Sequence, residues 1–400
     1  DPLWSRGLGD VYKRQAMELV RRIFLDKREI VLVGTSHISK ESAELVKEVI
    51  EKENPDIVCL EWDKTRYNKY MNPDEWSDTD IVQVIKQKKL IVLISSVIYS
   101  LIQKHLAKIN DSVPGAEFFQ AVNSAEKSGA KLALVDRDSQ ITFKRFWRLI
   151  PLRKKALFPH AFGKVLEGAE DSKEEMKKLL NSENFEPIFE QLQQTYPELW
   201  ESFLIERDLY MSTKILNEEG KKIVVIIGQA HLNGVEKNIK ENRKANIEEL
   251  DGLPPKLWST RVLESIIPLI IIGLLIYSFV LGMDIGINQI IRWGIWNGGV
   301  AALFTVLALA NPLTVITSLV LAPLATLLPM VSIGVFSAIV EATIRKPKVH
   351  DFQTMDEDLL SIKKIYKNRV LRIFLVFILA SIGGTVGNII GGLDIIKNLF

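Results

Sequence analysis

The sequence contains one cysteine in 400 residues, so no disulfide can form within the chain. Cys59 lies in an apolar run and is expected to be a small core residue, which agrees with a reducing compartment. The formal net charge is only +2, and the sequence has no basic stripe or aromatic platform. These absences argue against nucleic acid as a partner.

Residues 1–16 lack the apolar segment of a signal peptide and show no strand or helix periodicity. Met17, followed by Glu18 and Leu19, is typical of a natural start. We therefore expect residues 1–16 to be a non-native remnant that takes no part in the fold. Without a signal peptide, the soluble part of the chain is expected to stay in the cytoplasm.

Charge is scarce in one long region. Only four charged residues lie between Val262 and Ile344, whereas 25% of the whole chain is charged; the four are Glu264, Asp284, Arg292 and Glu341. A soluble helix rarely lacks a polar face over such a length. The composition predicts an α-helical transmembrane domain of about five helices at 258–400, in an integral protein of the cell membrane with the lipid bilayer as its partner.

Four segments are long enough to cross a bilayer, near 262–282, 290–310, 312–345 and 371–390, the third of them twice with a bend at Pro329. The connection from Arg345 to Arg372 carries eight Lys or Arg, whereas the turn after the first span offers only Arg292. The positive-inside rule places this connection and the preceding domain on the cytoplasmic side. Residues 262–345 should then cross four times, and a fifth crossing should leave the C-terminus outside.

Apolar runs alternate with amphipathic helices between residues 17 and 257. Four runs are predicted to be buried strands, at 30–33, 57–60, 131–135 and 223–227. We expect an α/β domain with a mainly parallel sheet and flanking helices, and with a helical insertion at about 140–220. The apolar stretch at 90–106 is predicted to be a buried helix, because it is short for a membrane span and has polar breaks.

A polar residue follows each predicted strand. His37 and His231 occupy the same Gly-x-x-His frame behind the first and last strands, while Glu61 follows the second strand and Asp136 the third. Parallel strands with right-handed crossovers bring their carboxyl ends to one edge of the sheet, where the chemistry of α/β proteins collects. We therefore predict that His37, Glu61 and His231 line one cleft.

Two imidazoles and a carboxylate can bind a divalent metal ion, with Mn, Co or Zn as candidates, and activate water. The same groups could act without metal, with a histidine as general base. A structural alternative also stays open, in which Glu61 caps a helix, Asp136 pairs with Arg137 and the histidines bond loop carbonyls. Glu206-Arg207-Asp208 is typical of a solvated cluster, although an inward Arg207 could bind an anionic substrate.

An ordered series of motifs runs from Ile30 to Asn388. It comprises GTSHIS at 34–39, PDIVCLEWDKTRY at 55–67, PGAEFF at 114–119, LVDRD at 134–138, IERDLYM at 205–211, GQAHLNGV at 228–235, NGGVAAL at 297–303, NPLTVITSLVLAPLATLLP at 311–329, RKPKVHDF at 345–352 and NRV at 368–370. In these motifs the chain resembles the TraB/PrgY family, named for pheromone-shutdown proteins. That family is related to the TIKI proteases and to the erythromycin-esterase and ChaN-like proteins.

The resemblance implies a membrane-anchored, metal-dependent hydrolase, with peptide as a substrate class, in which His37, His231 and Glu61 hold the metal. We take Glu61, Arg207, Glu206 and Asp136 as the candidate catalytic residues. The resemblance also implies an alternative, a peptide- or pheromone-binding membrane protein that shuts down signalling without catalysis. The oligomeric state is left open.

Overall fold

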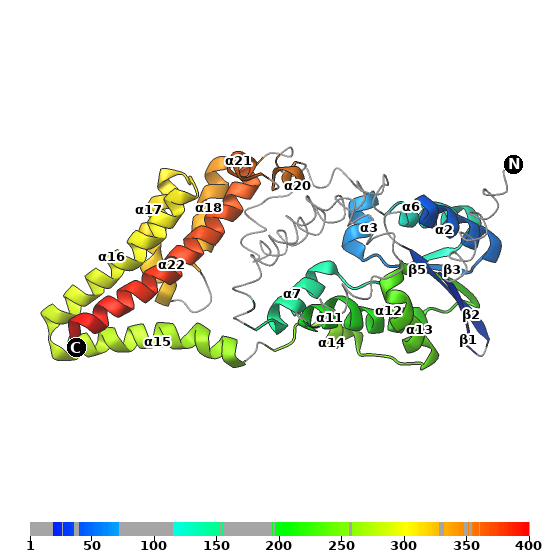
Figure 1. Cartoon of the computed structure of the whole chain (residues 1–400), viewed down its shortest axis with the longest axis horizontal. Helices are drawn as coiled ribbons and strands as arrows, with labels where there is room; N and C mark the ends of the chain where they lie inside the picture. Colours follow the sequence, from blue (N-terminus) through cyan, green and yellow to red (C-terminus); the bar gives the residue numbers. More distant parts are fainter. Residues whose placement is uncertain are drawn as a thin grey trace. The chain divides into compact units, whose positions relative to one another are not determined.

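The computed structural model of the chain describes residues 19–25, 27–35, 40–71, 115–151, 154, 194, 197–255, 258–327, 332–347, 351, 354–359 and 361–399. These residues divide into two compact units, the first ending at Pro255 and the second beginning at Trp258 (Figure 1). The predicted remnant at 1–16, the predicted buried helix at 90–106 and the predicted metal ligand His37 lie outside the described residues.

The first unit contains a five-stranded sheet in the order β1-β2-β5-β3-β4. Its strands are β1 (Val20–Leu25), β2 (Arg28–Thr35), β3 (Ile57–Leu60), β4 (Lys131–Leu134) and β5 (Lys222–Gly228). The four predicted strands are confirmed as β2 to β5, and they pair in parallel. Strand β1, which was not predicted, is an antiparallel edge strand that fully buries only Ile23. It therefore lacks the apolar run by which the other strands were recognised.

Helices cover both faces of the sheet, which explains why its central strands are apolar throughout. They are α2 (Lys40–Glu53) and α6 (Ala116–Ser128) on one face, and α12 (Glu206–Asn217) and α13 (Gln229–Lys240) on the other (Figure 1). Val31 and Val58 belong to the first core, whereas Ile30 and Cys59 belong to the second. Cys59 is buried as predicted, and burial raises the pKa of its thiol.

The helix ends of the first unit follow local sequence signals. Asn54 has φ 44° just after α2, and Gly129 has φ 71° just after α6, so both helices end at a left-handed residue. Asp138 caps α7 (Ser139–Leu149) by accepting a hydrogen bond of 2.7 Å from the backbone N–H of Gln140.

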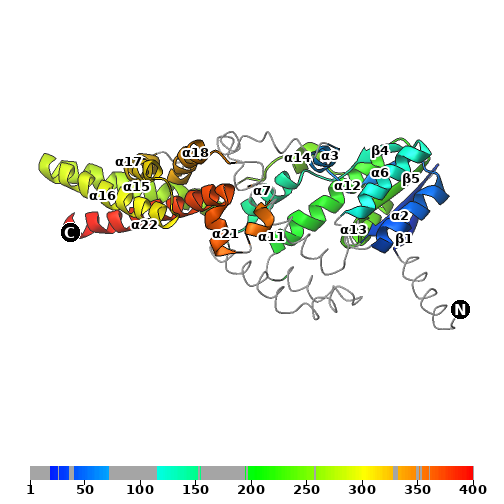
Figure 2. The ribbon, with the colours of Figure 1, turned by 90° about the horizontal axis from the view of Figure 1, so that it is seen from above.

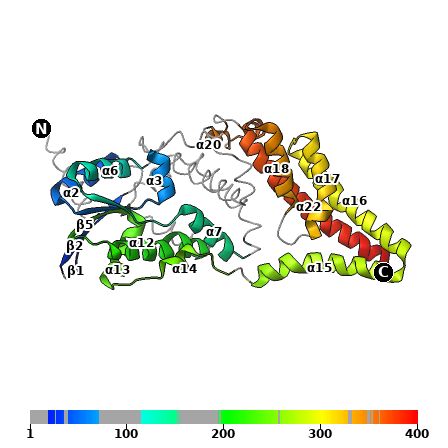
Figure 3. The ribbon, with the colours of Figure 1, turned by 180° about the vertical axis from the view of Figure 1, so that it is seen from behind.

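The described part of the predicted helical insertion lies beside the second core. It comprises α7, α11 (Pro197–Trp200), a π-helical turn η2 (Glu201–Ile205) and the start of α12. After α13 comes the short helix α14 (Ile247–Asp251), which packs against α12 (Figure 3). The start of α12, at Glu206, positions most of the charged groups described below.

The second unit is helical. It contains α15 (Trp258–Leu281), α16 (Met283–Leu307), α17 (Pro312–Leu327), α18 (Ile333–Arg345), α20 (Met355–Asp358), α21 (Ile362–Lys367) and α22 (Arg369–Leu399). Helices α16 and α22, which lie side by side in Figure 2, are long and apolar enough to cross a membrane. The chain turns at Gly282, where the first predicted span ends, but Arg292, which was assigned to this turn, lies inside α16. A bidentate ion pair with Asp394 of α22 accommodates its charge there.

Small residues bring the helices of the second unit close together. A Cβ atom added at Gly298 of α16 would lie 2.1 Å from the carbonyl oxygen of Leu319 in α17. On α22, Gly383, Gly387 and Gly391 recur every fourth residue against α16, and each would bring a Cβ within 2.9 Å of it. These glycines allow the helix backbones to approach closely, as in packed membrane helices.

Candidate functional site

The candidate site lies at the carboxyl edge of the sheet. In the parallel register of β2 and β5, Gly34 lies beside Ile227 and Thr35 beside Gly228. The two Gly-x-x-His motifs therefore begin on neighbouring strands of the sheet. Strand β3 adds Glu61, whose backbone N–H donates to the carbonyl of Ile226 in β5 at 3.1 Å. The described residues bring Glu61, Asp136 and His231 into one network of charged groups.

Glu61 is buried between two elements of the sheet edge. Its Oε2 accepts a hydrogen bond of 2.6 Å from the backbone N–H of Gly228, at the start of α13. Its Oε1 accepts one of 2.5 Å from Nη2 of Arg207 and lies 3.4 Å from Nε2 of His231. The positive end of the α13 dipole favours a carboxylate at this place. Glu61 thus reaches the helix that carries His231, and not the helix that follows Glu61 itself.

His231 is held by a carboxylate on the neighbouring helix. Its Nδ1 lies 2.5 Å from Oδ1 of Asp208, and both side chains are buried. Gly234, one turn further along α13, makes room for this pair, since a Cβ there would lie 1.9 Å from Oδ2 of Asp208. Burial raises the pKa of Asp208, although its hydrogen bond with His231 acts in the opposite direction. The arrangement fixes the ring and leaves Nε2 toward Glu61.

Asp136 is fully engaged with arginines. Arg207 donates to its Oδ1 from Nε at 3.0 Å and to its Oδ2 from Nη2 at 2.7 Å, and Arg66 donates to the same Oδ2. Burial alone would raise the pKa of Asp136, but the charges of Arg207 and Arg66 outweigh it and lower the pKa. Asp136 is therefore ionised at neutral pH, where it orients Arg207.

Glu206 belongs to a second cluster on the far side of α12. Its carboxylate accepts hydrogen bonds from Nη1 of Arg137 at 2.8 Å and from Nε and Nη2 of Arg145 at 2.7 Å each. Burial raises the pKa of Glu206, but the bonds from Arg145 and Arg137 outweigh it and lower the pKa. The side chain of Arg137 thus pairs with Glu206, and only its backbone N–H bonds Asp136.

Sequence reasoning missed several members of the network. Asp208 was considered only as part of a solvated cluster, and Asp63 and Arg66 were not singled out. Asp63 accepts from the backbone N–H and from Nε of Arg66, at 2.9 and 2.7 Å. The Asp-x-x-Arg spacing at the start of α3 (Lys64–Met71) was the available signal.

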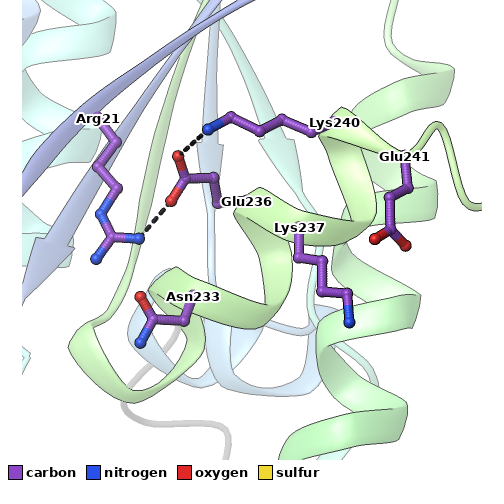
Figure 4. Close-up of a pocket in the computed structure, with 6 residues that line it drawn as sticks. All are labelled: Arg21, Asn233, Glu236, Lys237, Lys240 and Glu241. Atoms are coloured by element: carbon purple, nitrogen blue, oxygen red, sulfur yellow. Dashed lines mark hydrogen bonds and ion pairs between the residues drawn. The ribbon is translucent and has the colours of Figure 1, made fainter.

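The hollow shown in Figure 4 lies elsewhere, on the outer face of α13, with a volume of about 300 Å³. Glu236 is bonded there by Arg21 and by Lys240, so its charge is already compensated. Asn233, Lys237 and Glu241 complete the lining. His231, on the same helix, is buried and bonded to Asp208. The hollow therefore includes none of Glu61, Asp136 and His231, which form the network at the carboxyl edge of the sheet.

Comparison with known proteins matches both parts of the chain. Residues 19–248 match the TraB/PrgY/gumN family, and residues 259–400 match the C-terminal domain of TraB family proteins. An uncharacterized protein of Methanocaldococcus jannaschii is 27% identical over 387 residues, which cover 92% of this chain and 95% of that protein. TraB domain-containing proteins of Mus musculus and Homo sapiens are each 25% identical over 286 residues, covering 63% of this chain and 73% of theirs.

Proposed function

Because the chain belongs to the TraB/PrgY/gumN family, we propose that it is a membrane-anchored, metal-dependent hydrolase with peptide as its substrate class. The proposed metal ligands are His37, Glu61 and His231. One observation carries the proposal: Oε1 of Glu61 and Nε2 of His231 lie 3.4 Å apart, while Asp208 holds the other ring nitrogen.

The separation of these two donors suits a shared metal ion. Two ligands of a tetrahedral Zn²⁺, with bonds of about 2.0 to 2.2 Å, lie about 3.3 to 3.6 Å apart. Metal-bound histidines commonly donate their second ring N–H to a carboxylate, which is the relation between His231 and Asp208. Among the described residues no three His, Cys, Asp or Glu side chains gather as metal ligands. The proposal therefore depends on His37, outside that part of the chain, as the third ligand.

Charge balance supports a divalent cation. Among the described residues the network contains four carboxyl groups, those of Glu61, Asp63, Asp136 and Asp208, and two guanidinium groups, those of Arg66 and Arg207. Carboxylates thus outnumber guanidinium groups in this part of the site, and such surroundings favour a bound cation.

The surrounding residues have distinct roles in this proposal. A divalent cation supplies Lewis acidity and activates water when it is bound. Asp208 fixes the ring of His231, and Asp136 with Phe203 fixes Arg207, whose Nη1 donates to the Phe203 carbonyl at 3.2 Å. Arg207 then presents positive charge beside Glu61, where it can stabilise negative charge that develops on a substrate carbonyl.

The second unit is proposed as the membrane anchor. Large apolar side chains point outward from it, with Val280 76%, Leu269 64% and Leu393 61% exposed, while Ser318 and Thr305 are fully buried. This is the reverse of a soluble bundle and suits lipid surroundings. Basic residues between Arg345 and Arg372 favour the cytoplasmic side for that connection and for the first unit, with four crossings before it and one after it.

Metal binding tests the proposal. The full chain in detergent micelles, stripped with chelator and then supplied with Co²⁺, should retain stoichiometric metal. We expect His231→Ala and Glu61→Gln to lose it. Glu53→Gln is the matched control, because Glu53 is also a buried carboxylate paired with an arginine, Arg22, and should keep the metal. Peptide cleavage that requires the metal and stops with chelator would complete the case.

A second candidate function has one observation in its favour. Oε1 of Glu61, a proposed ligand atom, already accepts a hydrogen bond from Arg207. A carboxylate neutralised in this way suits a protein that binds a peptide without cleaving it. A metal-free wild-type chain that binds peptide and releases it intact would favour this peptide-binding, signal-blocking function over hydrolysis.

A further inference from the structure

Three arginines bind the segment of chain that leads to α15. Arg137 and Arg145 bond the end of α14, and Arg148 bonds the residues beyond it. Their acceptors are the carbonyl oxygens of Leu250 at 3.3 Å for Arg137, of Glu249 at 3.0 Å and Gly252 for Arg145, and of Pro254 at 2.8 Å for Arg148. We call these three arginines the arginine clamp.

Two arginines of the clamp, Arg137 and Arg145, converge on Glu206, the first residue of α12. Arg145 makes a two-pronged contact with the carboxylate of Glu206, and Arg137 adds a third donor. Arg137 also donates from Nη2 to the carbonyl of Ser202, in the π-helical turn before α12, at 2.8 Å. Arg137 is fully buried, and the side chains of Arg145 and Glu206 are 9% and 11% exposed. A planar guanidinium on a carboxylate in such surroundings fixes orientation as well as position.

Glu206 is followed directly by two residues of the candidate site. Successive residues of a helix point about 100° apart, so the three side chains leave α12 in different directions. Glu206 points to the clamp, Arg207 to Glu61 and Asp136, and Asp208 to His231. A shift of this single turn would therefore change the clamp and both site contacts together.

We propose that Glu206 and the arginine clamp are positioning residues, which hold Arg207 and Asp208 in register with Glu61 and His231. Because the same arginines bind the carbonyls at 249–254, the register of the site depends on the chain that leads to the first helix of the second unit. Because this inference describes how the groups of a metal site are held in position, it rests on the metal-dependent function proposed above. Glu206, a predicted catalytic residue, would then act through its neighbours.

Two features of the neighbouring structure bear on the first turn of α12. The π-helical turn η2 directly precedes α12, and such turns are frequent at functional sites. Tyr210, at the end of the same α12 turn, lies with its hydroxyl 3.4 Å from Oδ2 of Asp251 in α14. The start of α12 is thus attached to the α14 segment both by the clamp and by this contact.

The test compares clamp variants in the full chain in detergent micelles. Arg145→Gln removes the two-pronged contact, Arg145→Lys keeps the charge without the planar fork, and Arg148→Gln removes only the bond to Pro254. Arg22→Gln is the matched control, since Arg22 also pairs with a buried carboxylate, Glu53, in the same unit. Two quantities are measured: hydrogen exchange of the peptide covering 201–211, relative to 40–53, and Co²⁺ affinity.

We expect Arg145→Gln to speed exchange at 201–211 but not at 40–53, and to weaken Co²⁺ affinity about tenfold, as loss of supporting groups around metal ligands does. Arg145→Lys should lie between this variant and wild type, and Arg148→Gln should show a smaller change in the same direction. Arg22→Gln should change neither the exchange rate at 201–211 nor the Co²⁺ affinity.

Two results would overturn the inference: exchange at 201–211 that does not change, or exchange that rises equally at 40–53, which is general destabilisation. If Arg145→Gln does not fold, an unchanged Arg148→Gln would overturn the dependence on residues 249–254. A wild-type chain that binds no Co²⁺ would remove the proposed metal function, while the exchange data would still decide whether the clamp orders α12.

Discussion

The buried polar groups of the two units differ in kind. In the first unit about half of the described ones are charged, and most of these gather at the carboxyl edge of the sheet and around the start of α12. In the second unit the described interior groups are mainly neutral, such as Asn297, Thr305, Ser318 and Ser337. The exception is Glu341 of α18, whose carboxylate accepts hydrogen bonds from the backbone N–H of Asn311, just before α17, and from Arg345.

This difference shows what each kind of polarity contributes. A buried hydroxyl satisfies itself by bonding the carbonyl one turn earlier, as Thr305 does with Ala301 at 2.7 Å, and needs no counter-charge. A buried carboxylate or guanidinium is costly unless it is paired, so a cluster of them requires many converging partners. We infer that the charges of the first unit serve the site, whereas the neutral groups of the second unit serve helix packing.

The largest effect is expected from removing a buried charge of the first unit. Arg137→Met leaves carbonyls without donors and Glu206 with one arginine fewer, so we expect a loss of about 3 to 5 kcal/mol in the free energy of unfolding. Arg22→Met, at an exposed arginine, should cost less than about 1 kcal/mol. Denaturant unfolding of the full chain in micelles measures both. Equal losses would mean that burial of the charge is not the cause.

The next effect tests close packing in the second unit. Gly298→Ala places a methyl group 2.1 Å from a backbone oxygen, so α16 and α17 must separate, and we expect a loss of about 1 to 3 kcal/mol or more. Gly294→Ala in the same helix is the control, since nothing lies within 4 Å of its added Cβ. That change should be neutral or stabilising, because alanine favours helix over glycine. Thermal unfolding in micelles measures both variants. Equal melting temperatures for Gly298→Ala and Gly294→Ala would contradict the close approach of α16 and α17.

The sequence predicts those parts of the fold and site that depend on local patterns, and it does not predict the contacts that form between distant elements. Strands β2 to β5 and the positions of Glu61, Asp136 and His231 behind them depend on apolar runs and on the parallel sheet, which the sequence displays. Strand β1 has no such run. The partners of Arg137 and Asp208 depend on how α12 is rotated against the sheet, which no local pattern records.

The helical unit shows a similar division. Scarce charge predicts a helical unit, and the described residues from 258 onward are mainly helical; α17 ends at Leu327 and α18 begins at Ile333. Arg292 was assigned to a turn although it lies inside α16, because its partner Asp394 is about a hundred residues away in the sequence. Contacts between distant helices, such as Gly298 against Leu319, likewise appear only in the folded chain.

A pH series distinguishes charged from neutral interiors. The folded-state pKa of Glu206 lies below its ordinary value of 4.5, so its stabilisation is complete above that pH and is lost as pH falls through the lower folded value. The destabilisation caused by Glu206→Gln should therefore shrink below about pH 4.5, by about 1.4 kcal/mol for each unit of pKa difference. Melting curves of this variant and of wild type between pH 3 and pH 7 provide the measurement. A difference that stays constant would show that Glu206 is not held ionised by its arginines.

The smallest effect concerns the neutral ladder that joins three helices of the second unit. Ser318 of α17 lies 2.8 Å from the hydroxyls of both Thr305 in α16 and Ser337 in α18. Such bonds between membrane helices are worth about 0.6 kcal/mol on average. We expect a double-mutant cycle of Thr305→Val and Ser318→Ala to give a coupling of about that size, unchanged between pH 4 and pH 7 because neither group titrates. Thr317→Val is the control for the loss of a hydroxyl, since Thr317 is only half-buried and bonds only the Leu313 carbonyl of its own helix among the described contacts. A coupling that varies with pH would place an ionisable group in the ladder and weaken the division between a charged interior and a neutral one.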